Sequence, residues 1–295
     1  MVTSNEPGTR CPVCEGLLAA GRHEWLLRCA NCGFLCSRLQ PHLNAAEGIE
    51  ENRRAEALRD VRQKNFAVLL DIIQASCREG LLLDVGCGHG WFLQQAIARG
   101  YRGVGIEPDI QIAAIAQSHC SDIRTGLFPA ALRGDEMFDV IAFNDVLEHM
   151  PAVDDVLSAV RAHLRQDGCL VINIPLSSGI FYRVADLFDR LGVSSPFARM
   201  WQINFPSPHL SYFNAEQLIG LAERQGFHCL KFAHLPSLTW NGLWQRLRYD
   251  RSQSTLLAAI WWLLLTPVVP ILGLLPRDIG VFLFATERVG ASRGA

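Results

Sequence analysis

Four cysteines near the start of the sequence have the spacing of a metal-binding site. Cys11 and Cys14 form one Cys-x-x-Cys pair, and Cys29 and Cys32 form a second pair fourteen residues later. Two such pairs, joined by a short antiparallel hairpin, suit a tetrahedral Zn²⁺ ion held by four thiolates. Because four thiolates fill the coordination sphere, we expect a structural ion, and this ion would supply most of the stability of so small a unit. Cys36 and His23 are weaker candidate ligands.

The remaining cysteines carry no pairwise spacing. The opening residues "MVTSNEPGTR" lack the basic and then apolar pattern of a secretory signal, so we expect a cytoplasmic, reducing environment in which thiols bind metals rather than form disulfides. We therefore interpret six cysteines as mostly core residues: Cys36, Cys77, Cys87, Cys120, Cys169 and Cys229.

A glycine-rich turn is the second feature with chemical potential. Residues 80–106 read as a strand "GLLLDVG", a turn, a helix "WFLQQAIARG" and a strand "GVGIEPD", which is the order of a βαβ unit. Gly86, Gly88 and Gly90 let a ligand approach main-chain amides at the helix N-terminus. The third glycine comes one residue too early for the G-x-G-x-x-G dinucleotide fingerprint, which disfavours a dehydrogenase.

An acidic residue ends the second strand of this unit. Glu107 is placed to accept hydrogen bonds from two ribose hydroxyls, and the alternative is a solvated acid at a strand end.

These motifs resemble the class I S-adenosylmethionine-dependent methyltransferases, in which an acid precedes G-x-G-x-G and a second acid ends the next strand. The resemblance covers most of residues 60–235. Three segments are similar to the ubiquinone-biosynthesis and sugar or glycan methyltransferase-like group: "FDVIAFNDVLEHM" (138–150), "LRQDGCLVINIP" (164–175) and "PHLSYFNAEQLIGLAERQGF" (208–227). The segment "VFLFATER" (281–288) resembles the seventh, antiparallel strand. The resemblance implies an α/β fold with a Rossmann-like seven-stranded sheet.

The resemblance also implies which residues hold S-adenosylmethionine. Asp84 would lie near the methionine amino group, and Glu107 would bind the ribose hydroxyls. The glycine-rich loop would follow the carboxylate and ribose of the cofactor with Gly86, Cys87, Gly88 and Gly90. At the end of strand four, Asn144 and Asp145 would lie beside the cofactor. The adenine contact, near Thr125 to Leu127, stays open.

Two histidines are the candidate catalytic residues. Methyl transfer is an in-line displacement that mainly requires positioning and a dry site. A hydroxyl or acidic-carbon acceptor also requires a base, and His149 is the candidate, with a purely structural brace as the alternative. His209 either faces the acceptor or caps the helix that begins near Asn214. Because no second acid converges on Glu148, we predict no catalytic metal.

The remaining organisation follows from the positions of these motifs. We predict a zinc ribbon over 1–40, a helical linker that covers the cofactor over 41–78, and a methyltransferase core over 79–250, followed by an apolar hairpin over 251–277 and a last strand with a tail over 278–295. Residues 176–207 are too long for an ordinary connection, so they form either an acceptor-binding lid or a helical subdomain. Their aromatic residues suit an apolar or sugar-bearing acceptor: Phe181, Tyr182, Phe188, Phe197, Trp201 and Phe205.

An uncharged apolar stretch, 252–276, approaches the ~20 residues that span a bilayer. A single crossing would leave the last strand on the wrong side of the membrane. Pro267 and Pro270 favour a re-entrant or interfacial hairpin, and a buried helix pair or dimer face is the alternative. Flanking residues resemble an interfacial belt with basic anchors: Trp240, Trp244, Trp261, Trp262, Arg246, Arg248 and Arg251.

Together these features favour a peripheral or monotopic methyltransferase on the inner face of the membrane. Its acceptor would be a lipid-linked or envelope glycan, or a prenylated quinone. The alternatives are an RNA methyltransferase with zinc-knuckle recognition and a cofactor-binding scaffold that recruits a partner protein. A net charge of −2 disfavours nucleic acid. The role of the ribbon and the oligomeric state stay open.

Overall fold

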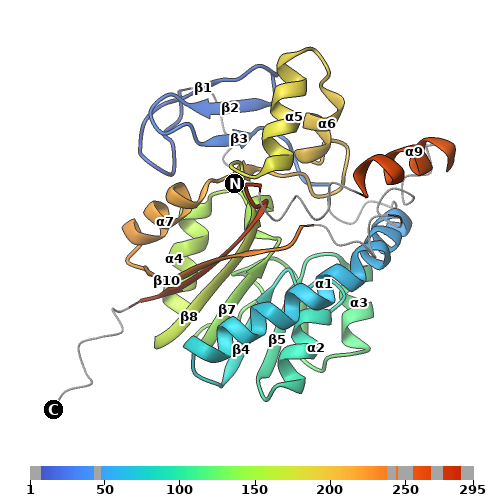
Figure 1. Cartoon of the computed structure of the whole chain (residues 1–295). Coiled ribbons are helices and arrows are strands. Elements are labelled where there is room, and N and C mark those ends of the chain that lie inside the picture. The colour runs from blue at the N-terminus through green and yellow to red at the C-terminus, as the bar shows by residue number, and fades with distance from the viewer. Residues whose placement is uncertain (1–7, 43–47, 238–243, 245–254, 267–274, 287–295) are drawn as a thin grey trace.

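The computed structural model describes residues 8–42, 48–237, 244, 255–266 and 275–286. Its centre is a seven-stranded sheet in the order β10-β11-β8-β7-β4-β5-β6 (Figure 1). All neighbouring pairs are parallel except those of β11, which runs antiparallel to β8 and β10. The strands are β4 (Leu81–Val85), β5 (Arg102–Glu107), β6 (Ile123–Thr125), β7 (Phe138–Asn144), β8 (Leu164–Pro175), β10 (His228–Leu235) and β11 (Ile279–Ala285). The predicted α/β fold with an antiparallel last strand is confirmed.

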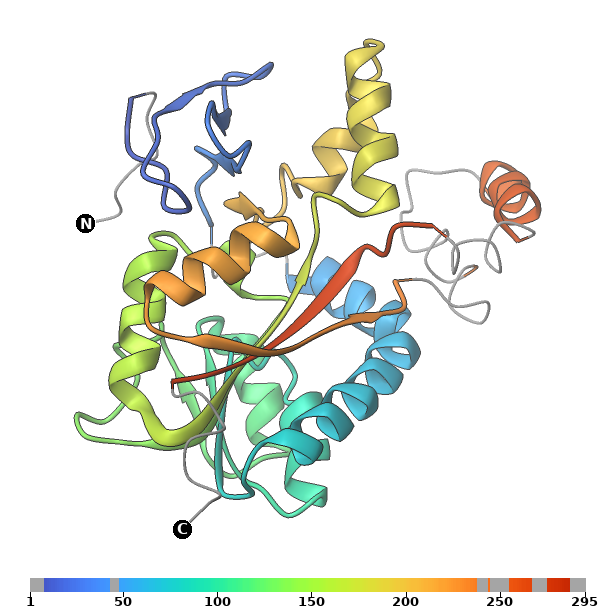
Figure 2. The ribbon, with the colours of Figure 1, turned by 60° about the vertical axis from the view of Figure 1, so that its left-hand side comes forward.

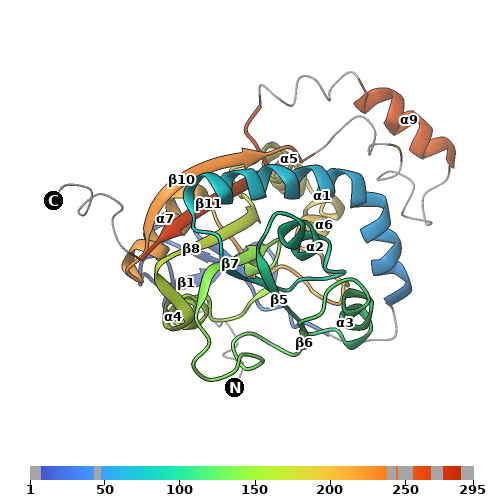
Figure 3. The ribbon, with the colours of Figure 1, turned by 90° about the horizontal axis from the view of Figure 1, so that it is seen from below.

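The helices cover both faces of this sheet (Figure 3). Alternate side chains of a strand point to opposite faces, so Leu82 packs with Phe66 and Leu93 on one face. Leu83 packs with Leu157 and Leu221 on the other. The first face carries α1 (Gly48–Ser76), α2 (Trp91–Ala98) and α3 (Ile110–Gln117), and the second carries α4 (Val153–His163) and α7 (Ala215–Arg224).

The cysteine pairs lie in a second, four-stranded sheet with the order β1-β2-β3-β9. Three of its strands form the predicted antiparallel ribbon: β1 (Leu18–Ala20), β2 (Leu26–Cys29) and β3 (Leu35–Ser37). The fourth, β9 (Ser211–Tyr212), comes from the middle of the methyltransferase core. The sheet that contains the ribbon therefore includes a fourth strand, β9, that is remote from the ribbon in sequence.

Residues 176–207, hereafter the lid segment, contain α5 (Ile180–Arg190) and α6 (Ser195–Met200). Tyr182, Phe197 and Trp201 are buried and pack against Leu26 of the ribbon. Figure 2 shows the ribbon and these two helices together at one end of the large sheet. Three of the six aromatic residues of the lid segment thus join it to the ribbon, whereas Phe188 is exposed.

One expectation about the cysteines is wrong. Cys77, just after α1, forms a disulfide with Cys169 of β8, and their Cα atoms lie 5.9 Å apart. The end of α1 packs against the sheet where β8 passes, which brings the two residues within the usual range for a disulfide. Because 92 positions separate them, their spacing in the sequence gave no indication of the pair.

Part of the apolar stretch forms a helix, α9 (Thr255–Leu265), at the periphery of the molecule (Figures 1 and 3). Leu256, Ile260 and Leu263 are exposed, and Trp262 contacts Trp244 edge-on at 6.3 Å between ring centroids. Within the described ranges, no helix has the length and apolar character needed to cross a bilayer. Other residues of the predicted hairpin and belt fall outside the described ranges: Trp240, Arg246, Arg248, Arg251, Pro267 and Pro270.

Candidate functional site

A cavity of about 1730 Å³ opens at the carboxyl ends of β4, β5, β7 and β8. It exceeds the ~300–1,000 Å³ of a typical site for one small ligand, so it has room for two. One side, which we name the cofactor wall, consists of residues 84–89, 106–109, 126–128 and 144–145. A second group of lining residues, which we name the acceptor wall, comes from 36–41 and 199–212. The expected ligand loop and the ribbon therefore face the same space.

The glycine loop has the backbone that the sequence predicts. Gly86 has a φ of 68°, and a Cβ atom there would lie 2.6 Å from the Val146 side chain. A Cβ at Gly88 would meet nothing within 4 Å, which leaves that part of the loop open to a ligand. Cys87 is buried and also borders the cavity. Gly90 begins α2 beside Ala116, so its small size serves the packing of α2 on α3.

Glu107 braces this loop from the end of β5. Its Oε2 accepts a hydrogen bond from the Gly88 N–H at 2.9 Å, and its Oε1 accepts one from the Asp109 N–H at 2.9 Å. Each carboxylate oxygen has a second lone pair, so both can also accept a ribose hydroxyl. The same side chain therefore shapes the loop and remains suitable for a ribose.

Asp84 is the second acid of the cofactor wall. Its carboxyl is 2% exposed, and burial, together with the negative charge of Glu107, raises its pKa well above the ordinary value. A cation bound beside it would counter both effects and favour the ionised form. The open loop and the buried acid pair thus fit a ligand that carries a cationic group and a ribose, as S-adenosylmethionine does.

The end of β7 supplies the other predicted cofactor residues. Asn144 and Asp145 line the cavity, and Asp145 has a φ of 56°. Asn173 of β8 holds both: its side-chain amide donates to Asn144 Oδ1, and its carbonyl accepts from the Asp145 N–H at 2.9 Å. The sequence reasoning missed Asn173, although a polar residue inside the apolar run "LVINIP" was a usable signal.

Two further segments complete the cofactor side. Gly126 and Leu127 line the cavity at the position left open for adenine recognition. Helix α1 lies within the linker predicted over 41–78, and its residues Arg62, Asn65 and Phe66 border the cavity.

The two candidate catalytic histidines lie together. His149 ends the short helix η1 (Leu147–His149), and its ring centroid is 4.6 Å from that of His209. His149 Nδ1 lies 2.9 Å from the Pro208 carbonyl, which can only accept, so Nδ1 carries the proton. In the neutral ring, Nε2 then has a lone pair, as a general base requires.

His209 has a different hydrogen bond. Its Nε2 accepts from the side-chain amide of Gln202 at 2.8 Å, so this lone pair is already used. His209 does not cap α7, because Asn214 and Gln217 form the capping box of that helix themselves. The described hydrogen bonds of the two rings therefore differ: that of His149 is at Nδ1 and that of His209 is at Nε2.

Glu148 joins this pair. Single ligand atoms of Glu148, His149 and His209 lie within 4.8 Å of one another, so the three could hold a divalent cation. Burial, and then the charge of Asp145, raises the pKa of Glu148, which favours its neutral form. Its Oε2 is buried without a hydrogen-bond partner among the described residues. The absence of a catalytic metal stays a prediction.

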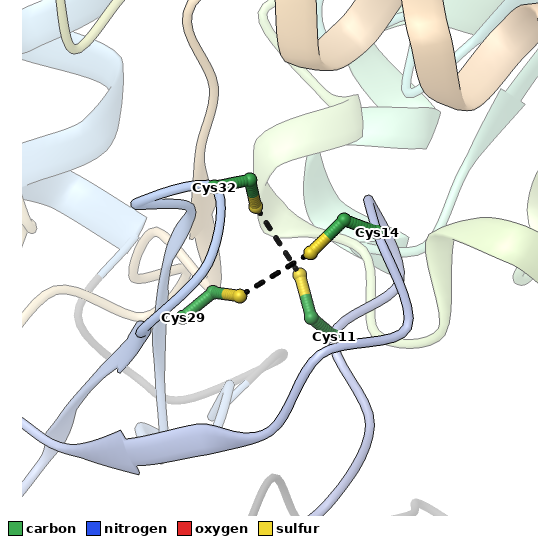
Figure 4. Close-up of side chains that lie close together, drawn as sticks. All are labelled: Cys11, Cys14, Cys29 and Cys32. Carbon is green, nitrogen blue, oxygen red and sulfur yellow. Dashed lines mark hydrogen bonds between the residues drawn. The ribbon is translucent and has the colours of Figure 1, made fainter.

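The four cysteines of the ribbon converge as predicted (Figure 4). Their sulfur atoms all lie within 4.8 Å of one another, with 3.7 Å between Cys11 and Cys32 and 3.4 Å between Cys14 and Cys29. Sulfur atoms around tetrahedral zinc, each at ~2.3 Å from the metal, are about 3.8 Å apart. The cluster therefore fits a Zn²⁺ ion. Cys36 and His23 are not part of this cluster. His23 Nε2 instead forms a hydrogen bond with Asp189 at 2.9 Å.

Comparison with known proteins agrees with this geometry. A model of the family described as "Methyltransferase domain" matches residues 50–231. The chain is 29% identical over 103 residues to a ubiquinone biosynthesis O-methyltransferase of Rhodopseudomonas palustris (strain TIE-1), covering 33% of this chain and 41% of the relative. It is 28% identical over 167 residues to a tRNA U34 carboxymethyltransferase of Histophilus somni (strain 129Pt), covering 53% and 48%. The chain thus spans less than half the length of these relatives.

Solved structures show the same fold at low sequence identity. A SAM-dependent methyltransferase from Archaeoglobus fulgidus has a TM-score of 0.52 and 16% identity, covering 78% of this chain and 96% of the other. A magnesium protoporphyrin IX methyltransferase from Synechocystis PCC 6803 with bound SAH has a TM-score of 0.53 and 13% identity, covering 83% and 96%. The predicted membership is confirmed: the chain belongs to the methyltransferase domain family and has the class I fold.

Proposed function

We propose that this member of the methyltransferase domain family transfers the methyl group of S-adenosylmethionine to a lipid-linked acceptor, either a polyprenyl-linked or envelope glycan or a prenylated quinone. The observation that carries the proposal is the single cavity with room for two ligands, lined by the cofactor wall and by the acceptor wall. Both candidate histidines border the space where the two ligands would meet.

The apolar stretch supports a lipid acceptor through its position. Ser237 and Asp278 flank the segment that contains α9, both line the cavity, and Ser237 Oγ donates to Asp278 Oδ2 at 3.1 Å. The apolar segment therefore leaves and rejoins the fold at the cavity. Its exposed Leu256, Ile260 and Leu263 are suited to a membrane surface, where the acceptor would be anchored.

The chemistry follows from the side chains on the two walls. S-adenosylmethionine supplies an electrophilic methyl group on a sulfonium. Asp84 would pair with its ammonium and Glu107 with its ribose, which fixes the direction of the methyl group. His149 Nε2 would accept the proton of the acceptor as the acceptor bonds to the methyl carbon, and the electron pair of the breaking C–S bond stays on sulfur.

We assign the cysteine cluster a structural zinc ion. Cys11, Cys14, Cys29 and Cys32 provide four sulfur ligands and no open position, so the ion would stabilise the ribbon and take no part in the transfer.

An RNA acceptor is the second candidate, because one of the curated relatives is a tRNA U34 carboxymethyltransferase. The net charge of −2 weighs against it, since phosphate contacts need a clustered positive surface. A scaffold without transfer activity is the third candidate. The open glycine loop and the buried acids weigh against that role.

The test is incubation of the purified chain with methyl-labelled S-adenosylmethionine and a total lipid extract, followed by partition between organic solvent and water. We expect label in the organic phase, absent with Asp84→Asn. A parallel incubation replaces the lipid extract with transfer RNA. Label found only in that incubation would favour the RNA alternative. No label with any acceptor, together with intact cofactor binding by calorimetry, would favour the scaffold.

Membrane contact is tested separately by flotation with vesicles of anionic phospholipid. The double variant Leu256→Ser and Leu263→Ser should lose flotation. Leu17→Ser, which changes an equally exposed leucine on the ribbon, should retain it. Equal flotation of all three proteins would contradict a role for α9 at the membrane.

A further inference from the structure

The segment that carries His209 lies between the ribbon and the short helix that carries His149. On the ribbon side, Ser37 Oγ donates to the His209 carbonyl at 2.8 Å, and the Ser37 N–H donates to the Leu210 carbonyl at 2.9 Å. On the opposite side, the Leu210 N–H donates to the Glu148 carbonyl at 2.7 Å. His209 is therefore held through its main chain by two separate parts of the sequence.

The pairing of β3 with β9 extends this contact. Leu35 lies opposite Tyr212 and Cys36 opposite Ser211, and the rings of Phe34 and Phe213 are 4.8 Å apart. Ser37 is only 2% exposed. Loss of its hydroxyl would leave the buried His209 carbonyl short of a hydrogen-bond partner, which is unfavourable.

The metal-binding turns of the ribbon are attached to the helix that follows this segment. The Gln217 side-chain amide donates to the Cys32 carbonyl at 2.9 Å. The Arg224 guanidinium donates to the carbonyls of Pro12 and Val13. Both cysteine pairs thus contact α7, while β3 contacts the residues just before it. The arrangement of the four cysteines therefore sets the distance between the two turns that contact α7.

From this arrangement we infer that the ribbon is the positioning element of the acceptor site. The ribbon, held in shape by its metal, sets the place of His209 and of residues 208–212 through Ser37 and the β3–β9 pairing, and it supplies residues 36–41 to the acceptor wall. The inference rests on the proposed function for the identity of that wall. A structural metal in the ribbon would thereby serve the methyltransferase core of the same chain.

The loops of the cofactor wall are held by a different set of hydrogen bonds. These loops follow β4, β5, β6 and β7 and are held by Glu107 and Asn173, which belong to the large sheet. Removal of the metal should therefore loosen the acceptor wall and leave cofactor binding intact. If the ribbon only stabilised the chain as a whole, removal of the metal would loosen both walls to the same extent.

The first experiment compares the metal-loaded full chain with the same chain after treatment with a chelator, with zinc content measured by mass spectrometry. Hydrogen exchange of the amides of 208–212 should accelerate about tenfold or more, as expected for loss of ~1.4 kcal/mol of local stability. Exchange in 81–90 and the Kd for S-adenosylhomocysteine should stay within about threefold of the untreated chain, since the hydrogen bonds of the ribbon described above run to 208–212 and to α7.

The second experiment keeps the metal and removes the hydroxyl. Ser37→Ala should accelerate exchange in 208–212 and raise the KM for the acceptor about tenfold with a smaller change in kcat, whereas Ser37→Thr should restore both. Ser118→Ala, which removes a hydroxyl from the exposed end of α3, is the matched control and should change neither.

Unchanged exchange in 208–212 in both experiments would overturn the inference, as would an equal loss of S-adenosylhomocysteine binding. A chain that never contains zinc and yet protects 208–212 would also overturn it. Neither hydrogen exchange nor S-adenosylhomocysteine binding requires an acceptor. If they behave as expected while no acceptor is methylated, the proposed function fails and the positioning role of the ribbon stands.

Discussion

The two walls of the cavity are built in different ways. The cofactor wall comes from loops that follow consecutive strands of one sheet, and Glu107 reaches only nineteen residues back to the Gly88 N–H. The acceptor wall joins the ribbon at 36–41 to residues 199–212 across more than 150 positions, as the contact from Ser37 to the His209 carbonyl shows.

This difference indicates how the walls should respond to change. A wall made by one sheet shares the stability of the large core, with Asp84 and Glu107 held by strands that are buried on both faces. A wall made by several segments depends on each contact between them, so it can be altered while the first wall keeps its shape. The following predictions test that separation, beginning with the largest effect.

His149→Gln should reduce kcat by about 10²–10⁴, because it removes the side chain that we propose as the base. The acidic limb of the rate profile against pH should disappear, since protonation of the base no longer limits the rate. His209→Gln should have a smaller effect, because its Nε2 is already bonded to Gln202. The measurement is transfer of labelled methyl groups between pH 5 and about pH 9, a range that spans imidazole titration.

The affinity for S-adenosylhomocysteine should be the same in both histidine variants and the unmodified chain. If His149→Gln retained the full rate and the acidic limb, His149 would be a structural brace.

Asp84→Asn should weaken the binding of S-adenosylhomocysteine about 10- to 100-fold, which corresponds to the ~1.5–3 kcal/mol of a hydrogen bond to a charged group. Hydrogen exchange in 208–212 should not change, because Asp84 belongs to the other wall. Titration calorimetry gives the affinity. The control is Asp167→Asn, which makes the same change at an exposed ion pair with Arg78. If Asp84→Asn accelerated hydrogen exchange in 208–212 and left the affinity for S-adenosylhomocysteine unchanged, the separation of the walls would be contradicted.

The same contrast explains what the sequence could reveal. Asp84, the glycine loop and Glu107 lie within one βαβ unit, whose local pattern dictates their geometry. The four cysteines likewise form a local motif. By contrast, the pairing of β3 with β9, the contacts of Ser37 and the Cys77–Cys169 disulfide join residues that are remote in sequence. Their partners depend on how complete elements pack, and no spacing encodes that.

The aromatic residues of the lid segment illustrate this limit. Their composition indicated an acceptor site, and Phe181 and Phe205 do line the cavity. Tyr182, Phe197 and Trp201 instead pack on the ribbon. Composition indicated an apolar or sugar-bearing partner for these side chains, but not that the ribbon would be the partner of three of them.

Asp189→Asn should loosen the contact between the lid segment and the ribbon by about 1–3 kcal/mol. The buried Asp189 side chain accepts hydrogen bonds from Arg22 at 3.0 Å and from His23 at 2.9 Å. Although burial raises its pKa, the bonds from Ser194, His23 and Arg22 outweigh this and lower it. The stabilisation is therefore present above the pKa of the unfolded chain and is lost as the pH falls through the lower folded value.

Denaturant unfolding and hydrogen exchange of 22–28 measure this change, and Asp167→Asn again serves as the exposed control. The difference between the two variants should shrink in acid. If Asp189→Asn altered S-adenosylhomocysteine binding more than exchange in 22–28, the lid segment and the ribbon would belong to the cofactor side of the comparison.

The smallest predicted effect is the pH dependence of cofactor-side binding. Burial and then Glu107 raise the pKa of Asp84 in the free protein. The ammonium of S-adenosylhomocysteine would lower it again, so binding releases a proton. Affinity should then increase with pH, by at most about tenfold per pH unit for one proton, and become constant above the raised pKa of the free protein. Asp84→Asn should remove the slope. Chelation should leave it unchanged, because the metal acts on the other wall, whereas a slope that vanished with the metal would show that the walls are coupled.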